Sequence, residues 1–247
     1  MTVCLTVDVE DWYDGMAEVG HVLPAPPLPP SGLEALGALL AGAPAARLTL
    51  FVVGKYCATV AGELRALAAD GHEVASHGPD HGTPPQGAAE LEDWLRRGRE
   101  MAEEVVQRPV TGFRSPRFRI PAVGLERYRE ILAQAGYRYV SDCHRVGPGS
   151  PVKELPVFRW RGVPLGGGSY QRLLPKAGIT PFLAGRKEPA VLYYHSYDFG
   201  VPLPSPLASR SPAVLKQVLG RRRIPGVVRR LLSDHGSVTC SEVTNDV

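Results

Sequence analysis

Short apolar segments alternate with segments of helical spacing along this chain, and that alternation constrains the fold more than any other feature. Residues 3–9 (VCLTVDV) and 47–54 (RLTLFVVG) have the β-branched and apolar character of buried strands. Further strands are expected at residues 72–77, 110–116, 137–142, 190–198 and 237–243, and helices at residues 33–42, 63–71, 88–107, 125–136 and 213–234. Because strands separated by helices join through right-handed crossovers, we predict an α/β protein with a parallel sheet.

The size and composition of the chain fit one globular domain. Its 247 residues lie within the range of a single α/β barrel, and a hydrophobic content of 44% is enough to bury a core. No internal repeat interrupts the pattern, so we interpret residues 1–247 as one domain. The net charge of +3 is too small to indicate a nucleic-acid partner.

Basic residues are densest near the C-terminus. Arg221, Arg222 and Arg223 are consecutive, and Arg229 and Arg230 follow within two helical turns. We interpret this run as the solvated face of a helix, and the alternative is contact with an anionic partner or polymer.

The cysteines and the N-terminal residues indicate the cellular compartment of the protein. The four cysteines are scattered without a CxxC pair, which favours buried free thiols. No charged leader precedes an apolar segment at the N-terminus, and no stretch reaches the roughly 18 apolar residues that a membrane span needs. We therefore expect a cytoplasmic protein with no membrane span.

Several polar residues fall at or just beyond the C-terminal end of a predicted strand. They are Asp8, His77, Arg114, Asp142 and His195. In α/β barrels and open parallel sheets, binding and catalytic groups gather at this edge. The sequence therefore predicts an active site at the C-terminal strand ends.

Two histidines and a cluster of acids indicate a metal site at the same edge. His77 and His81 are four positions apart, so both imidazoles can face one point. Asp8, Glu10 and Asp11 crowd the end of the first strand, and carboxylates this close resist joint ionisation unless a cation offsets them. Two imidazoles with one or two carboxylate oxygens suit Zn²⁺, or alternatively Co²⁺ or Ni²⁺, with positions left for water and substrate.

Five motifs then stand in order along the chain. They are DVED at residues 8–11, SHGPDH at 76–81, FRSPRF at 113–118, YVSD at 139–142 and LYYHSYDF at 192–199. In this order the sequence resembles the polysaccharide deacetylase family, which includes chitin, peptidoglycan and nodulation-factor deacetylases. Two further stretches, residues 154–175 and 229–243, look like the subgroup associated with exopolysaccharide export. The resemblance implies a distorted (β/α) barrel with the active site at the C-terminal strand ends.

The resemblance also implies a role for each motif residue outside the metal site. Asp8 would be the general base, and Arg114 would pair with it and hold it ionised. His195 would donate a proton to the departing amine, because an amide nitrogen does not leave as an anion near neutral pH. Asp142 would orient His195.

The metal ligands implied by the resemblance are His77, His81 and one acidic residue. The family usually has two adjacent aspartates, and here the motif is stretched to Asp-Val-Glu-Asp. Alternation along a strand places Glu10 on the face of Asp8, whereas a strand that ends at Val9 would free Asp11. Both remain candidates, and we prefer Asp11.

The function implied is metal-dependent removal of an N-acetyl group from an N-acetylated amino sugar or glycoside. In a second hypothesis the same fold hydrolyses a different amide bond, and the protein is a cyclic imide or ureide hydrolase or a deformylase. A third is a non-catalytic carbohydrate-binding module. The presence of every expected base, acid and ligand argues against the third.

Overall fold

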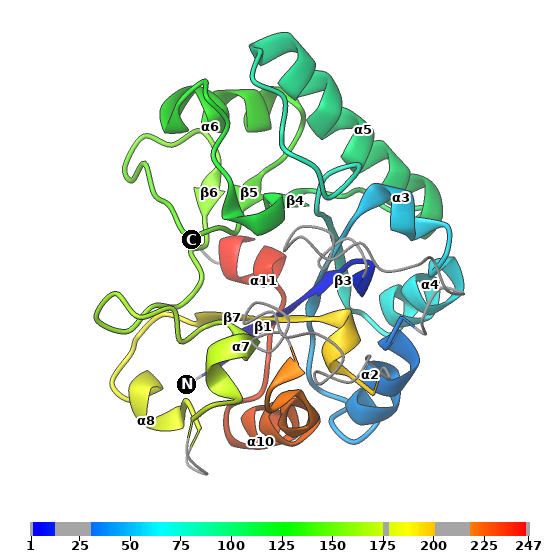
Figure 1. Cartoon of the computed structure of the whole chain (residues 1–247), viewed down its shortest axis with the longest axis vertical. Helices are drawn as coiled ribbons and strands as arrows, with labels where there is room; N and C mark the ends of the chain where they lie inside the picture. Colours follow the sequence, from blue (N-terminus) through cyan, green and yellow to red (C-terminus); the bar gives the residue numbers. More distant parts are fainter. Residues whose placement is uncertain (1, 13–30, 175–177, 201–217, 246–247) are drawn as a thin grey trace.

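The computed structural model describes residues 2–12, 31–174, 178–200 and 218–245, and a parallel sheet forms its centre. Seven strands pair in the order β6-β5-β4-β3-β2-β1-β7, all parallel. Their bounds are β1 Val3–Val9, β2 Thr49–Val52, β3 Glu73–Ser76, β4 Gly112–Phe113, β5 Tyr139–Val140, β6 Lys153–Glu154 and β7 Ala190–His195. The sheet curls into a half-barrel with helices around it (Figure 1), which confirms the α/β distorted barrel expected from the sequence.

The register of the central strands brings their C-terminal ends level. β1 is buried along its whole length, and its Asp8 lies opposite His195 of β7. On the other side of β1, Val9 lies opposite Val52, which in turn lies opposite Ser76 of β3. Residues that follow β1 and β3 therefore emerge beside the end of β7.

Helices cover the outer face of the sheet with their apolar sides. The longer ones are α2 Leu33–Leu40, α4 Ala61–Ala69, α5 Ala88–Val106, α6 Leu125–Gln134 and α10 Ile224–His235. The shorter ones are α3 Gly54–Cys57, α7 Gly168–Gln171 and α8 Thr180–Leu183, with 3-10 turns η1 Pro116–Phe118, η2 Ser196–Asp198 and η4 Arg221–Arg223. In α5 the side chains of Leu91, Leu95 and Ala102 are buried against the core. No helix in the described ranges is both long and apolar enough to cross a membrane.

The C-terminal segment differs from the sequence prediction. Residues 237–243 were expected as a strand, but after a single bridge between Val3 and Ser237 the chain forms helix α11, Cys240–Asn245. Thr239 and Glu242 form a reciprocal capping box, in which Thr239 N donates to the Glu242 carboxylate and Glu242 N donates to Thr239 Oγ1. This Thr-x-x-Glu pattern starts a helix, and it outweighed the β-branched composition. The predicted helix at 213–234 is described only from residue 218, because 213–217 lie outside the described residues.

Candidate active site

Glu10, His77 and His81 form a buried cluster at the C-terminal edge of the sheet. One ligand atom from each lies within 4.8 Å of the other two. The Oε2 atom of Glu10 is 2.7 Å from His81 Nε2 and 3.7 Å from His77 Nε2. One carboxylate and two imidazoles leave coordination positions for water and substrate, so the donor set fits a catalytic divalent cation.

A backbone contact orients the His77 ring. Its Nδ1 lies 2.9 Å from the carbonyl oxygen of Arg114. Because a carbonyl oxygen can only accept, Nδ1 carries the hydrogen and Nε2 turns its lone pair toward Glu10. Burial lowers the pKa of His77 to about 4, so the ring is neutral near pH 7, as a metal ligand must be.

The loop between the two histidines is shaped by Gly78. Its φ of 80° lies in the left-handed region, and a Cβ there would come within 2.4 Å of the Trp94 ring of α5. On the facing helix, a Cβ at Gly98 would come within 2.7 Å of the Gly78 carbonyl carbon. The two glycines therefore let the loop lie directly against α5, which turns the chain so that His77 and His81 face each other at a ring separation of 5.6 Å.

The third member of the cluster is Glu10 and not Asp11, which corrects the preference drawn from the sequence. β1 ends at Val9, but its alternation continues for one more residue and places Glu10 on the inner face with Asp8. Asp11 is half-buried beside Tyr56, whose pKa is raised to about 12 by burial and by the Asp11 charge.

The neighbouring imidazoles keep the Glu10 side chain ionised. Burial by itself would raise the pKa of Glu10, but the imidazoles of His81 and His195 outweigh burial and lower the pKa to about 2. Glu10 is therefore a carboxylate over the whole range in which the protein would work, and its two oxygens face three imidazoles.

Asp8 and Arg114 form a buried ion pair next to this cluster. Arg114 Nη1 donates to Asp8 Oδ1 at 2.6 Å, the pairing expected from the sequence. The guanidinium also donates to Thr6 Oγ1 and to the hydroxyl and carbonyl of Ser141, and it lies 4.1 Å from the centre of the Phe51 ring. With nearly all its donors used, Arg114 holds Asp8 in one orientation.

His195 lies at the end of β7 and faces the Glu10 oxygen that the histidine pair does not. Its Nε2 is 3.7 Å from Glu10 Oε1, and its side chain is 21% exposed, so it can reach both the cluster and solvent. Its ring stacks on Tyr197 at 4.8 Å and 5°. Burial would lower the pKa of His195, but the adjacent carboxylate of Asp198 and the charges of Glu10 and Asp8 outweigh burial and raise the pKa.

The carboxylate beside His195 is Asp198, and this corrects the role assigned to Asp142. Asp198 Oδ2 lies 3.7 Å from His195 Nδ1 and accepts the His195 backbone N–H at 3.0 Å. Asp142 instead binds the buried Arg129 at 2.9 Å and accepts the His144 backbone N–H at 2.7 Å. Asp198 is three residues from His195 in the turn η2, and the HSYD sequence is the signal that could have identified it.

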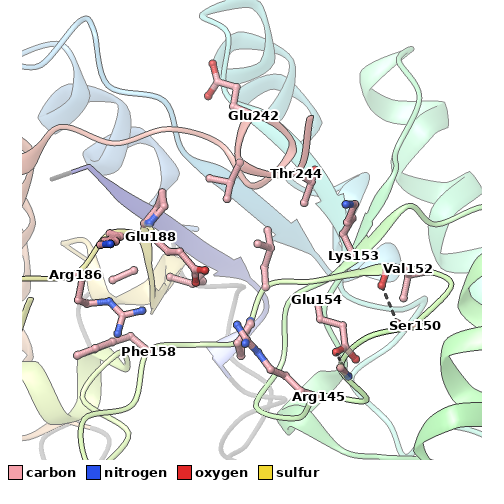
Figure 2. Close-up of a pocket in the computed structure, with 18 of the residues that line it drawn as sticks. Arg145, Ser150, Val152, Lys153, Glu154, Phe158, Arg186, Glu188, Glu242 and Thr244 are labelled. Atoms are coloured by element: carbon pink, nitrogen blue, oxygen red, sulfur yellow. Dashed lines mark hydrogen bonds between the residues drawn. The ribbon is translucent and has the colours of Figure 1, made fainter. Parts of the chain in front are cut away.

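A separate pocket of about 790 Å³ lies at the other end of the sheet. It is lined by residues at the N-terminal ends of β1, β6 and β7 and by α11; Figure 2 shows Lys153, Glu242 and Thr244 among them. None of the residues of the histidine cluster lines it. The pocket is therefore separate from the histidine cluster at the C-terminal edge.

Comparison with known proteins agrees with this fold. The family model described as polysaccharide deacetylase matches residues 33–140, a range that contains His77, His81 and Arg114 but neither Asp8 nor His195. The sequence shows no significant match to a curated protein.

Solved structures extend the similarity to nearly the whole chain. A Mycobacterium smegmatis protein provisionally named a polysaccharide deacetylase has 21% identity and a TM-score of 0.60, over 100% of this chain and 89% of its own. PuuE allantoinase has 13% identity and a TM-score of 0.62, over 99% and 89%. A CE4-family pseudoenzyme from Bacillus anthracis has 12% identity and a TM-score of 0.56, over 98% and 64%.

At these identities the solved structures establish the fold alone, and the family model is similar to residues 33–140. The family is one of hydrolases that remove acetyl groups and generally use a divalent metal, and it also contains pseudoenzymes. Residues 33–140 therefore match the polysaccharide deacetylase family model, and nearly the whole chain shares its fold with the solved structures.

Proposed function

We propose that this protein is a metal-dependent hydrolase that removes the N-acetyl group from an N-acetylated amino sugar or glycoside. The observation that carries the proposal is the buried Glu10–His77–His81 cluster, which has Asp8 and His195 on two adjacent strands in register beside it. The proposed metal is Zn²⁺, with Co²⁺ or Ni²⁺ as alternatives, held by the three residues of the cluster. The match to the polysaccharide deacetylase family model and the donor set of the cluster support this substrate class.

Two residues transfer protons during hydrolysis of the amide, Asp8 as the base and His195 as the acid. Asp8, held by Arg114, accepts a proton from the attacking water as the water oxygen bonds to the carbonyl carbon. A bound divalent cation supplies Lewis acidity, which lowers the pKa of water and polarises the carbonyl. His195 donates a proton to the sugar nitrogen as the C–N bond breaks, leaving acetate and a free amine.

Two features support this assignment of base and acid. Asp8 and His195 lie on adjacent strands at the same level, so their side chains flank one substrate position. The pKa of His195 is raised by Asp198, Glu10 and Asp8 against the effect of burial, which favours the protonated ring that a general acid needs.

Elemental analysis of the purified protein tests the metal site. We expect about one divalent ion per chain, and His77→Ala should lose it because only two of the three ligands remain. The matched control is His144→Ala, a half-buried loop histidine that contacts Asp142 through its backbone. A protein that is active and free of metal would contradict the proposal.

Release of acetate tests the reaction itself. Chito-oligomers and nucleotide-linked N-acetylglucosamine are the substrates to compare, since they separate polymer from small-molecule activity. His195→Ala should lower kcat by roughly 100-fold or more while leaving the metal content intact. Full activity of that variant would show that another group donates the proton.

A second candidate is hydrolysis of a cyclic ureide or imide. The observation that favours it is the similarity over nearly the whole chain to a protein named an allantoinase. Turnover of hydantoin-like rings without release of acetate from any acetylated sugar would favour this candidate. A chain that binds sugar but turns over neither class would match the pseudoenzyme relative.

A further inference from the structure

Cys4 of β1 and Cys240 of α11 form a pair of buried thiols outside the candidate active site. Their Sγ atoms lie 3.2 Å apart, although 236 positions separate the two residues in the sequence. Neither side chain is exposed to solvent. Among the described residues, Cys57 and Cys143 make no such contact with another thiol. The contact therefore joins the first strand to the last helix of the described chain (Figure 1).

The segment that leads into α11 is held against β1 on both sides of Cys4. Val238 N donates to the carbonyl of Val3 at 3.1 Å, and Leu5 N donates to the Oγ atom of Ser237 at 3.0 Å. Val3 and Leu5 are the two sequence neighbours of Cys4. These hydrogen bonds therefore fix the backbone of the strand against the start of the helix.

A polar network fixes the start of α11 against β2 and β3 as well. Cys240 N donates to Thr49 Oγ1 at 2.8 Å, and Ser241 N donates to the Glu73 carboxylate at 3.0 Å. The same carboxylate accepts from the hydroxyls of Thr49 and Tyr139, each at 2.8 Å. Because the helix start cannot shift without breaking these bonds, the Cys240 thiol is held in one place beside β1.

The surroundings of the two sulfurs are apolar. Both belong to a buried cluster whose other members are Phe51, Ala75, Tyr139, Val157 and Val191. The contact with the Cys240 thiol, and secondarily burial, raise the pKa of Cys4 well above its ordinary value. Cys4 is therefore a protonated thiol near neutral pH and reacts slowly while the protein is folded. Such a pair suits a lasting structural bond and not a fast sensor.

We propose that Cys4 and Cys240 form a disulfide that ties α11 to β1 when a small-molecule disulfide is present as the oxidant. The two sulfurs need to approach by only about 1.2 Å to reach the length of a disulfide bond. One thiolate attacks the oxidant, forms a mixed disulfide and releases one small thiol; the second thiolate then attacks the protein sulfur and releases the other. The protein loses two protons and two electrons, and the oxidant is reduced to two thiols.

The bond makes the stability of the fold depend on the thiol redox state. It closes a loop that spans the chain from residue 4 to residue 240, which restricts the unfolded ensemble. Opening of α11, a helix of six residues close to the C-terminus, exposes Cys240 and admits the oxidant. Neither the histidine cluster nor the proposed reaction takes part in this chemistry.

Refolding of the 247-residue chain from urea in reduced or oxidised glutathione tests the bond. In the oxidised buffer we expect two of the four thiols to resist alkylation and the intact mass to fall by two hydrogens. A non-reducing peptide map should join the peptide of Cys4 to that of Cys240. The equilibrium constant for unfolding should be on the order of 100-fold lower for the oxidised protein than for the reduced protein.

The matched control is Cys57→Ala with Cys143→Ala, which should keep both the bond and the difference in stability, whereas Cys240→Ala should lose both. Each protein is compared with itself in the two buffers, so a lower stability of one variant does not affect the comparison. If a variant does not fold, the peptide map of the parent decides. Four free thiols after refolding in the oxidised buffer, a bond that includes Cys57 or Cys143, or equal stability of the two forms of the parent would overturn the proposal.

Discussion

Single residues in this site are distinguished by what contacts them. Asp142 and Asp198 both follow a strand, and both are buried carboxylates. Asp142 is bound by Arg129, which also binds Glu154, so the three form a buried ion network. Asp198 is the carboxylate that meets the imidazole of His195. The first therefore contributes to stability and the second to the orientation of the proposed acid.

Isosteric substitution separates these two aspartates. Asp198→Asn should lower kcat by roughly tenfold or more, because a neutral amide neither orients nor charges the His195 ring as a carboxylate does. Asp142→Asn should lower the free energy of unfolding by about 3 kcal/mol, because Arg129 keeps only part of its neutralising charge. Steady-state kinetics and chemical denaturation of both variants check this.

The reverse pattern would contradict the assignment. If Asp142→Asn lost turnover at unchanged stability, the charge that acts on His195 would come from β5 instead of η2. Asp198→Glu, which keeps the charge on a longer side chain, should recover part of the lost turnover.

At the scale of elements, the loop from β3 to α5 decides the site. Its histidines converge because Gly78 adopts a left-handed conformation and fits beneath Trp94. The strand register then sets the level at which Glu10 and His195 meet them. The site is thus built from one loop, packed on a helix, and the ends of two neighbouring strands.

Gly78→Ala should destabilise the protein more than a glycine substitution that introduces backbone strain alone. Gly185→Ala provides that reference, because Gly185 also has a positive φ, of 78°, but nothing lies within 4 Å of its added Cβ. Strain should cost about 1–2 kcal/mol at both positions, and only Gly78→Ala adds a clash with Trp94.

Denaturation midpoints and Co²⁺ titration measure the two effects. We expect Gly78→Ala to bind the ion more weakly than the parent and Gly185→Ala to bind it equally well. Equal stability losses and equal affinities in the two variants would show that the close contact with α5 is unimportant for the site.

At the scale of the whole molecule, acid weakens folding through buried histidines. His72 precedes β3, is buried, and accepts a hydrogen bond from Leu48 N at 3.2 Å through Nδ1. Burial, and secondarily the charge of Arg47, lower the pKa of His72 below 6.5. The unfolded chain therefore binds this proton more readily than the folded one, so the contribution to stability is present above pH 6.5 and is lost as the pH falls through the folded-state pKa.

His72→Asn retains an acceptor for Leu48 N but does not titrate. Its free energy of unfolding should fall less steeply between about pH 7 and about pH 5 than that of the parent, by at most about 1.4 kcal/mol per pH unit. Urea denaturation across this range measures the slopes, and His144→Asn serves as the control. Parallel slopes for the parent and His72→Asn would contradict the prediction.

Local patterns in the sequence were sufficient to predict the framework. The alternation of strands and helices, and the polar residues that end the strands, depend on periodicities within a few residues. Parallel strands joined by crossovers bring those ends to one edge whatever the details of packing. The parallel sheet, the edge that carries the site, the His77–His81 pair and the contact of Arg114 with Asp8 were all predictable for this reason.

Tertiary structure alone decided which carboxylates join the site. Glu10 replaced Asp11 because the inner face of β1 continues past the last paired residue. Asp198 replaced Asp142 because Arg129 binds the Asp142 carboxylate, while Asp198 lies beside His195 in the turn that follows β7. Contact between the two ends of the chain also buries Cys240 of α11 against Cys4 of β1. Choices of this kind depend on contacts between residues far apart in the chain, and local periodicity carries no information about them.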